Sequence, residues 1–440
     1  MTTHLPWWLA HPMRRLVDEI QHHRLPRELA ARLRRLCASN PIDLTRAYEL
    51  TETPDLQRQI SQQLWCSGAF EQPELWLRHA AEGPRYQAAY RNKREIGRSI
   101  VLKAPGPGGE RGVLLLTFEY NWAKLMLGLD AAGRKWLDQH YHLILSTSWS
   151  PTDYSMLAMM LACSSQRLWV QSCNPAEIAA IEAFHPRLSC LRTMPCDWLD
   201  PDTIEPLDAH QRDIDLLMVA NWGDFKRHWE FFHTLRQLPA QWRIVLVGQH
   251  AQGRHVPYVK DLARHYQVPQ PLDIHEGIPI SEVAALQARS KVAVILSRRE
   301  GCCVAAVEAM MAGSALAMRS DAHIGPRAHI NPQTGALLRP GHLAADLLAL
   351  HSRHQALNPR SWCLQQACNR HSLKQLERQL QGHDLGMGRP WTRGLALPMW
   401  KPHPIFADIQ EQQQLKPAYE ELSQRFPELF TLKLWAQRWD

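Results

Sequence analysis

The 440-residue sequence contains no apolar run long enough to cross a membrane. A spanning helix needs about 20 mainly apolar residues, and no uncharged apolar run in this chain reaches even about 18. The N-terminus also has no basic segment followed by a long apolar core, so a signal peptide is not predicted. The 45% of hydrophobic residues can fill the cores of two or three domains, which excludes disordered and fibrous proteins.

The ten cysteines lack the spacing of a zinc site. Cys302 and Cys303 are adjacent, whereas Cys363, Cys368 and His371 share one predicted helix. Scattered cysteines of this kind are more typical of free thiols in an intracellular protein than of disulfides. The sequence therefore favours the cytoplasm.

Charge of one sign is not concentrated in any long segment, although the chain carries a net charge of +7. That balance could attract an anionic membrane, a phosphorylated substrate or nucleic acid, but no aromatic and basic recognition motif supports nucleic acid. Aromatic and basic residues do meet near the N-terminus, at Trp7, Trp8, Leu9, Met13, Arg14, Arg15 and Leu16. Peripheral membrane contact through this group is one hypothesis. The alternative is a terminal helix that packs its tryptophans on the body.

The most informative stretch is a strand-to-helix junction at residues 297–313. Residues 291–296 are apolar and rich in β-branched types, which predicts a buried strand of a parallel sheet. A helix is predicted from about Cys303 to a terminating Gly313. The N-terminus of such a helix presents N–H groups and a partial positive charge that suit the phosphates of a nucleotide. The predicted binding positions are Gly301, Cys302, Cys303 and Val304.

Two glutamates, Glu300 and Glu308, lie on either side of this junction, the first in the loop and the second in the helix. A glycosidase acid/base pair needs carboxyl groups roughly 5–10 Å apart. Eight helical steps would separate these two by roughly 12 Å and turn them by about 80°, which argues against such a pair. One glutamate could instead reach a sugar and the other a ribose, or both could be ordinary surface charges.

Further segments accompany the junction in a fixed order: residues 216–227, 242–248, 275–279 and 331–338. In order and spacing over about residues 190–375 they resemble family-four retaining glycosyltransferases, whose E-x7-E signature the two glutamates reproduce. The resemblance implies an α/β fold of the GT-B type, with two facing Rossmann-like domains, to which this chain adds an N-terminal helical extension. It also implies a nucleotide-sugar donor, a glycan, lipid-linked or protein acceptor, and a reaction that needs neither a metal nor another cofactor.

By the same resemblance, Lys226 would neutralise the leaving diphosphate with help from Arg227, and Glu300 would hold hydroxyls of the donor sugar. Glu308 would accept hydrogen bonds from the ribose. Gly248, at the end of a predicted strand, also belongs to the expected donor site.

The chain departs from the family at two places. Asn221 stands where an arginine is usual, so one of two phosphate-binding cations is missing, and Asn cannot supply a bidentate grip. The loop at 321–327 keeps only Gly325 of a glycine pair. A non-catalytic GT-B subunit that binds a sugar nucleotide is therefore the alternative function, and a GT-B epimerase or phosphorylase is a weaker one.

Four regions are predicted: a helical extension at 1–105, an acceptor domain at 106–205, a donor domain at 206–365 and a crossover helix with a tail at 366–440. Polar residues in the loops that follow the first strands of the acceptor domain would face its ligand, because open α/β sheets bind ligands there. The candidates are Asn121, Lys124 and Asp153. Two Asp-x-Asp triplets, at 200–202 and 213–215, are attributed to chance, and no metal site is predicted.

Overall fold

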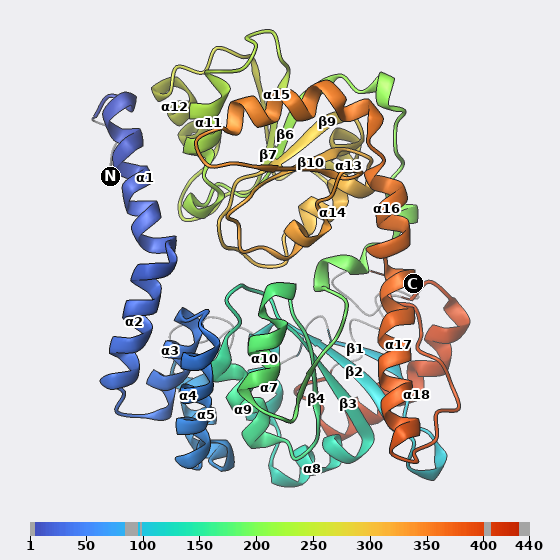
Figure 1. Ribbon diagram of the computed structural model, residues 1–440. Helices are drawn as coiled ribbons and strands as arrows, with labels where there is room; N and C mark the ends of the chain where they lie inside the picture. Colours follow the sequence, from blue (N-terminus) through green and yellow to red (C-terminus); the bar gives the residue numbers. More distant parts are fainter. Residues whose placement is uncertain (1–4, 84–95, 97–98, 400–405, 431–440) are drawn as a thin grey trace. The chain divides into compact units, whose positions relative to one another are not determined.

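The computed structural model describes residues 5–83, 96, 99–399 and 406–430 (Figure 1). The chain forms two compact units and passes between them three times. Unit 1 comprises residues 1–23 and 199–368, and unit 2 comprises residues 24–198 and 369–440. The helices that precede the first strand are therefore divided between the units, with the first helix in unit 1.

Unit 2 contains a five-stranded sheet in the order β1-β2-β3-β4-β5, in which β1 is antiparallel to β2 and the other pairs are parallel. The strands are β1 (Ser99–Lys103), β2 (Gly112–Thr117), β3 (Tyr141–Ser146), β4 (Leu168–Gln171) and β5 (Leu188–Cys190). The helices are α2 (Arg24–Leu36), α3 (Pro41–Leu50), α4 (Pro54–Cys66), α5 (Pro73–Glu82), α7 (Glu119–Gly128), α8 (Ala131–His140), α9 (Tyr154–Cys163), α10 (Ile178–Phe184), α17 (Asn369–Gly386) and α18 (Ile409–Arg425). Every residue of β2 and β3 is buried, as expected for strands covered on both faces.

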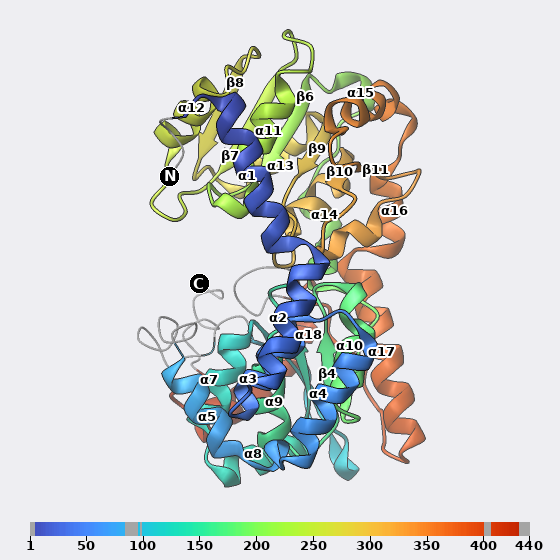
Figure 2. The ribbon, with the colours of Figure 1, turned by 60° about the vertical axis from the view of Figure 1, so that its left-hand side comes forward.

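Unit 1 contains a six-stranded, fully parallel sheet in the order β11-β10-β9-β6-β7-β8. The strands are β6 (Ile214–Val219), β7 (Ile244–Gly248), β8 (Leu272–Glu276), β9 (Ser290–Ile295), β10 (Ala315–Arg319) and β11 (Gly335–Leu338). The helices are α1 (Trp7–His22), α11 (His228–Leu235), α12 (Val256–His265), α13 (Ile280–Ala288), α14 (Val304–Met311), α15 (Leu343–Arg353) and α16 (Pro359–Gln366). Outside the sheet, α1 contacts α11 (Figure 2).

The core of unit 1 follows from the two-residue period of its strands. In β6, Leu216 and Met218 pack in the cluster that contains α11, α12 and α15, whereas Leu217 packs in a second cluster with Leu286 of α13. Apolar residues on both faces of a parallel strand require helices on both sides, because each face must be removed from water.

The predicted α/β class, with two parallel-sheet units and a helical N-terminal region, is confirmed. The predicted strand at 291–296 is β9, and the predicted helix after Cys303 is α14. The prediction that a single helix contains Cys363, Cys368 and His371 is wrong, because α16 ends at Gln366 and α17 begins at Asn369. Among the described residues, no helix combines the length and the apolar character needed to span a bilayer.

Candidate active site

The carboxyl ends of β6 and β9 mark the point where the sheet of unit 1 changes direction. From β6 the chain adds β7 and β8 on one side, and then returns to the other side of β6 to form β9, β10 and β11. Open α/β sheets bind ligands outside the carboxyl ends of the strands at such a switch point. The loops at 220–227 and 296–303, which leave β6 and β9, are therefore the candidate binding loops.

Lys226 and Glu300 meet across these two loops. The Lys226 Nζ lies 2.9 Å from Oε1 and 2.8 Å from Oε2 of Glu300. The two side chains are only 15% and 3% exposed. Burial acts to lower the pKa of Lys226, but the Glu300 carboxylate outweighs it, and the net pKa lies above the usual lysine value. The site therefore holds a permanently charged lysine beside a carboxylate, at the switch point of the sheet.

Both loops end on a residue in the left-handed region just before a helix. Arg227, with φ 62°, precedes α11, and Cys303, with φ 46°, precedes α14. Residues other than glycine rarely adopt this conformation, and such residues cluster at ligand sites. Burial raises the pKa of the Cys303 thiol well above its usual value, and the Glu300 carboxylate raises it further. Cys303 is therefore a neutral thiol, unsuited to act as a nucleophile.

The remaining predicted positions at this junction are less enclosed. Gly301, Cys302 and Val304 are half-buried around the start of α14. Because their backbone lies at the N-terminus of a helix, their N–H groups are placed where an anion is favoured.

Glu308 lies one turn further along α14 and is half-buried. Burial raises the pKa of its carboxyl group, and a hydrogen bond from Gln287 of α13 acts in the opposite direction. Gln287 is itself buried and also donates to the Ala305 carbonyl at 3.4 Å. Glu308 thus lies in α14 and Glu300 in the loop before it, and their carboxyl groups have different surroundings.

Asn221 and Gly248 have local structural functions in the same region. The Asn221 Oδ1 accepts a hydrogen bond from the Gly223 N–H at 3.1 Å and so forms a turn after β6. A Cβ atom at Gly248 would lie 2.4 Å from the Ala220 carbonyl oxygen and 2.7 Å from the Trp222 ring, so only glycine fits there. The ring of Trp222 donates through Nε1 to Glu276.

Arg227 lies in a buried ion-pair network. Its guanidinium donates to Glu230 at 2.8 Å and to Asp18 of α1. Arg319 donates to the two oxygens of Glu230 at 2.5 and 2.6 Å, and Arg298 donates to Asp18 at 3.0 Å. The Arg227 side chain is therefore directed to the carboxylates of Asp18 and Glu230, whereas the Lys226 side chain is directed to Glu300.

Two polar atoms at this end of the sheet were not identified from the sequence. The Ser297 Oγ and the His228 Nε2 are buried and have no hydrogen-bond partner among the described residues. Burial lowers the pKa of His228 to about 3, and the charges of Lys226 and Arg254 contribute, so the ring is neutral. Ser297 could have been predicted from its position directly after a buried strand. No local sequence pattern indicates that His228 belongs to this region.

The candidate acceptor residues lie in unit 2, where local contacts engage each of them. The buried Asn121 amide donates to the Thr117 carbonyl at 2.7 Å. The Lys124 Nζ lies 5.6 Å from the centroid of the Tyr120 ring. The buried Asp153 caps the N-terminus of α9 and accepts from the Ser155 and Met156 N–H groups, at 3.1 and 3.2 Å, and from the Ser155 hydroxyl at 2.6 Å.

Local partners also engage the Asp-x-Asp triplets. The Asp200 carboxylate accepts from the Asp202 N–H at 3.1 Å and caps a short turn. Asp213 accepts from Arg289 at 2.9 Å. Asp215 pairs with Lys291 at 2.6 Å and with His351 at 2.8 Å. Burial acts to raise the pKa of Asp215, but these hydrogen bonds lower it to about 2.

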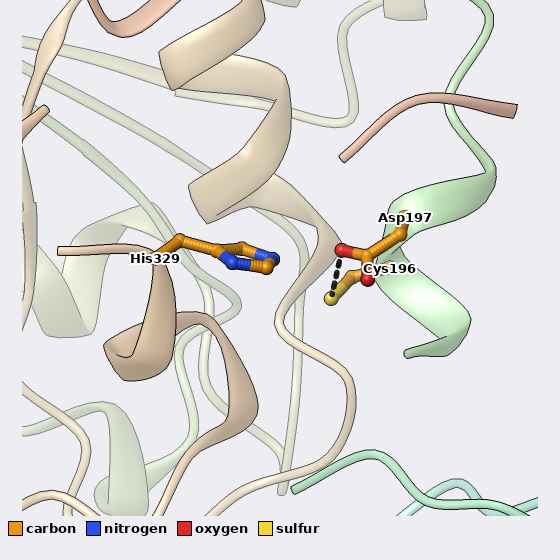
Figure 3. A group of neighbouring side chains, drawn as sticks. All are labelled: Cys196, Asp197 and His329. Atoms are coloured by element: carbon orange, nitrogen blue, oxygen red, sulfur yellow. Dashed lines mark hydrogen bonds between the residues drawn. The ribbon is translucent and has the colours of Figure 1, made fainter. Parts of the chain in front are cut away.

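The segment just before the first return to unit 1 contains a short 3₁₀ helix, η4 (Pro195–Trp198). Figure 3 shows that the Cys196 Sγ donates to the Asp197 Oδ1, and the distance is 3.6 Å. The other Asp197 oxygen accepts from the Met194 N–H at 2.9 Å. His329, also drawn in Figure 3, belongs to η8 (Gly325–His329) of unit 1, where its ring centroid lies 4.9 Å from that of Trp362.

Comparison with known proteins finds one family whose model matches most of the 199–368 segment of unit 1. Residues 201–353 match the family described as "Glycosyl transferases group 1". No curated protein sequence matches the chain.

Three solved structures of low sequence identity resemble part of this chain. Sucrose-phosphate synthase from Thermosynechococcus elongatus is 17% identical over 62% of this chain and 74% of its own, with a TM-score of 0.48. The pneumococcal O-GlcNAc transferase GtfA, solved with UDP and GlcNAc, is 13% identical over 61% and 56%, with a TM-score of 0.44. Alr3699/HepE from Anabaena, solved with UDP and glucose, is 16% identical over 61% and 78%, with a TM-score of 0.46.

Proposed function

We propose that the protein is a retaining glycosyltransferase, because residues 201–353 match the family described as "Glycosyl transferases group 1". The donor is a nucleotide diphosphate sugar, and the acceptor is a hydroxyl of a glycan, a lipid-linked sugar or a protein. The proposed reaction belongs in the cytoplasm, where sugar nucleotides are made. The observation that carries the proposal is the buried pair of Lys226 and Glu300 at the switch point between β6 and β9.

In the proposed reaction the acceptor oxygen bonds to the anomeric carbon on the face from which the nucleoside diphosphate leaves. The bond between that carbon and the phosphate oxygen breaks, and the leaving phosphate takes the acceptor proton. The products are a glycoside and a nucleoside diphosphate. Negative charge develops on the leaving oxygen, and preorganised cations and N–H groups stabilise such charge without rearranging.

Two features supply that stabilisation. Lys226 carries a charge that its environment maintains, since Glu300 raises its pKa despite burial. The N-terminus of α14 adds its partial positive charge from the adjacent loop. The resemblance to family-four enzymes implies a reaction without a metal, so the proposal assigns charge stabilisation to these two groups and includes no metal ion and no other cofactor.

When the donor binds, its diphosphate is proposed to replace Glu300 as the partner of Lys226. The Glu300 carboxylate would then accept hydrogen bonds from hydroxyls of the donor sugar. The Glu300 carboxylate is buried and accepts hydrogen bonds from Lys226 at both of its oxygens. A diphosphate that binds the Lys226 Nζ would compete directly with the Glu300 carboxylate. Glu308, further along α14, is proposed to accept hydrogen bonds from the ribose.

The alternative is a subunit that binds a sugar nucleotide without transferring it. Asn221 replaces the usual arginine and is held in a turn by Gly223. Arg227, the neighbouring cation, is engaged by Asp18 and Glu230. A site with one phosphate-binding cation could bind a donor and yet stabilise its leaving group poorly, so binding and turnover must be measured separately.

The first experiment is a thermal-shift screen of nucleotide sugars, because a ligand that binds only the folded protein raises its apparent stability. The stabilising donor is then used to measure transfer and donor hydrolysis. For Lys226→Met, turnover is expected to fall by about 10²–10³-fold, the usual loss for one such electrostatic group. Lys260→Met, at an exposed lysine of α12, is the control and should leave turnover unchanged.

Lys226→Met leaves a buried carboxylate unpaired, so the double variant Lys226→Met/Glu300→Gln serves as a check on folding. Wild-type turnover in Lys226→Met would contradict the proposed role. Donor binding by the wild type with neither transfer nor hydrolysis would favour the non-catalytic alternative.

A further inference from the structure

Helix α1 packs on unit 1 through a mainly polar side, which also holds the buried Ala10 and the partly buried Trp7. His11 stacks on His233 of α11 with ring centroids 3.7 Å apart, and the Arg236 guanidinium lies 3.6 Å from the centroid of the Trp7 ring. Near its other end, Asp18 pairs with Arg227 and Arg298. Charged, stacked and cation–π contacts along one side therefore fix which face of α1 points to the protein.

The opposite side of α1 is apolar and exposed. The exposed fractions are 41% for Leu9, 49% for Met13, 63% for Leu16, 53% for Val17 and 57% for Ile20. Steps of three, four and seven residues put these side chains on one stripe of a helix. A surface helix of a globular protein normally buries its apolar stripe and exposes its polar side. Helix α1 shows the opposite arrangement, with its apolar stripe exposed.

Helix α2 of unit 2 carries a second stripe of this kind. Leu25, Leu29, Leu33 and Leu36 recur at helical spacing, and each is more than half exposed. Together the two helices hold ten of the twenty large hydrophobic side chains that are exposed in the described chain. Each helix therefore carries a continuous apolar stripe rather than the scattered exposure usual for a soluble surface.

The charges around these stripes are mainly positive. Residues 7–36 contain seven arginines and three acids, which leaves a net charge of +4 without the histidines. Two of the acids, Asp18 and Glu19, are paired with Arg298 of unit 1. The third, Glu28, accepts from the Thr51 hydroxyl in unit 2. Protein contacts thus engage all three acids, and they also engage Arg27 and Arg35. The exposed charges of the two helices are then the arginines Arg15, Arg24, Arg32 and Arg34.

We propose that the exposed apolar faces of α1 and α2 bind an anionic lipid bilayer, with the leucine-rich stripes in the headgroup region and the arginines on the lipid phosphates. Apolar stripes flanked by arginine, with an exposed tryptophan at Trp8, are the composition of interfacial helices. Arginine side chains can lie along apolar surface while their charged ends reach the headgroups. A second copy of this chain fits less well, because it would oppose one cationic surface to another.

The test is flotation of the full chain with vesicles of phosphatidylcholine alone and with added phosphatidylglycerol. The protein is expected to float with the anionic vesicles and much less with the neutral ones, and added salt should reduce its recovery. Leu16→Gln/Ile20→Gln should weaken partitioning at least tenfold. Ile280→Gln/Met387→Gln, which removes two equally exposed apolar side chains elsewhere, is the matched control and should float as the wild type does.

The outcomes distinguish a lipid bilayer from a second copy of the chain as the partner of α1 and α2. Failure of the wild type to float, or equal flotation of Leu16→Gln/Ile20→Gln, would overturn the proposal. A concentration-dependent dimer that the same two substitutions abolish, without flotation of the wild type, would assign the surface to a second copy and also overturn it. No donor sugar is needed, so the result is independent of the proposed transfer reaction.

Discussion

Glu308 shows at the residue scale how the fold changes the chemistry of one side chain. Burial raises the pKa of this carboxyl group above the usual value of 4.5, and the hydrogen bond from Gln287 offsets the rise only in part. The folded protein therefore holds a proton on Glu308 more tightly than the unfolded chain does. As pH rises from 4.5 through the folded pKa, the free energy of unfolding must fall, because the unfolded chain ionises first.

A Glu308→Gln variant removes that ionisation while keeping the size of the side chain. We expect its free energy of unfolding to exceed that of the wild type at pH 7, and the difference to shrink when pH is lowered to about 4, where the wild-type carboxyl is protonated. Urea denaturation at the two pH values measures both. A difference that does not change with pH would show that ionisation of Glu308 is not the cause.

The same variant tests the ribose contact. If Glu308 accepts hydrogen bonds from a ribose, Glu308→Gln should weaken nucleotide binding while transfer at saturating donor falls less. Calorimetry of nucleotide binding at pH 7 measures the change. An unaltered dissociation constant would place the nucleotide elsewhere.

The Lys226 and Glu300 pair also shows which site features the sequence could predict. Each residue was expected near the donor because its segment resembles the matching segment of family-four glycosyltransferases. Their direct contact was not expected, because it depends on β9 lying next to β6, and strand order is not encoded in any local pattern. The network of Arg227 was missed for the same reason, since Asp18 is more than 200 residues away in sequence.

At the scale of elements, α1 carries buried histidines that make its docking sensitive to acid. Burial lowers the pKa of His11 to about 3, and nearby His233 and three arginines, Arg14, Arg15 and Arg227, lower it further. Burial also lowers the pKa of His22 to about 4, against the opposing charge of Asp18. Both rings are therefore neutral when the helix is docked.

We expect α1 to dock less firmly as pH falls. A released helix would return its histidines to a pKa near 6.5, so the released form binds protons that the docked form rejects. The stabilisation is full above about pH 6.5 and is lost as pH falls toward 4. Hydrogen exchange of residues 7–22, corrected for the intrinsic effect of pH, should show faster exchange at pH 5.0 than at pH 7.5.

The variant His11→Phe keeps an aromatic ring on His233 but cannot take up a proton. Its exchange in α1 should depend less on pH than that of the wild type, whereas His210→Phe, at an exposed histidine, should behave as the wild type does. Equal pH dependence in all three proteins would exclude His11 as the titrating group.

The orientation of α1 could not be read from the sequence, although its periodicity was visible. A pattern of apolar residues at helical spacing predicts an amphipathic helix, and the ordinary inference is that the apolar stripe is buried. Here polar contacts with Arg227, Arg298 and His233 fix the opposite face to unit 1. By contrast, β9 and α14 were predicted well, because runs of β-branched residues and good helix formers act locally.

At the scale of the whole molecule, neither unit is a continuous piece of chain. In unit 2 the C-terminal segment is joined to the sheet through buried polar groups. The Val101 N–H donates to the Tyr419 hydroxyl at 2.9 Å, and His142 of β3 contacts Asp384 of α17 at 2.8 Å. Residues 369–430 are therefore an integral part of unit 2.

The buried pair of Lys103 and Glu110 is the most sensitive point of that connection. Their side chains are 2.6 Å apart and almost fully buried, the Trp391 ring covers the ammonium group at 3.7 Å, and Glu110 accepts from the Thr392 N–H at 2.7 Å. Glu110→Gln leaves Lys103 charged and unpaired, which should lower the free energy of unfolding by about 3–5 kcal/mol.

Urea denaturation of the full chain measures this loss. The double variant Lys103→Met/Glu110→Gln removes the unpaired charge and should recover much of the stability. A loss below about 1 kcal/mol in Glu110→Gln would mean that Lys103 reaches water or another partner.

The carboxylate of Asp18 pairs with guanidinium groups from two neighbouring loops. These two contacts therefore depend on the position of α1 along its own axis. Arg227 directly follows Lys226, and Arg298 precedes Glu300 by two residues. If α1 slid by one turn, about 5.4 Å, both arginines would lose their contact with Asp18. Any surface that pulls α1 along its axis would therefore transmit that pull to the two chain segments that bring the lysine and the glutamate together.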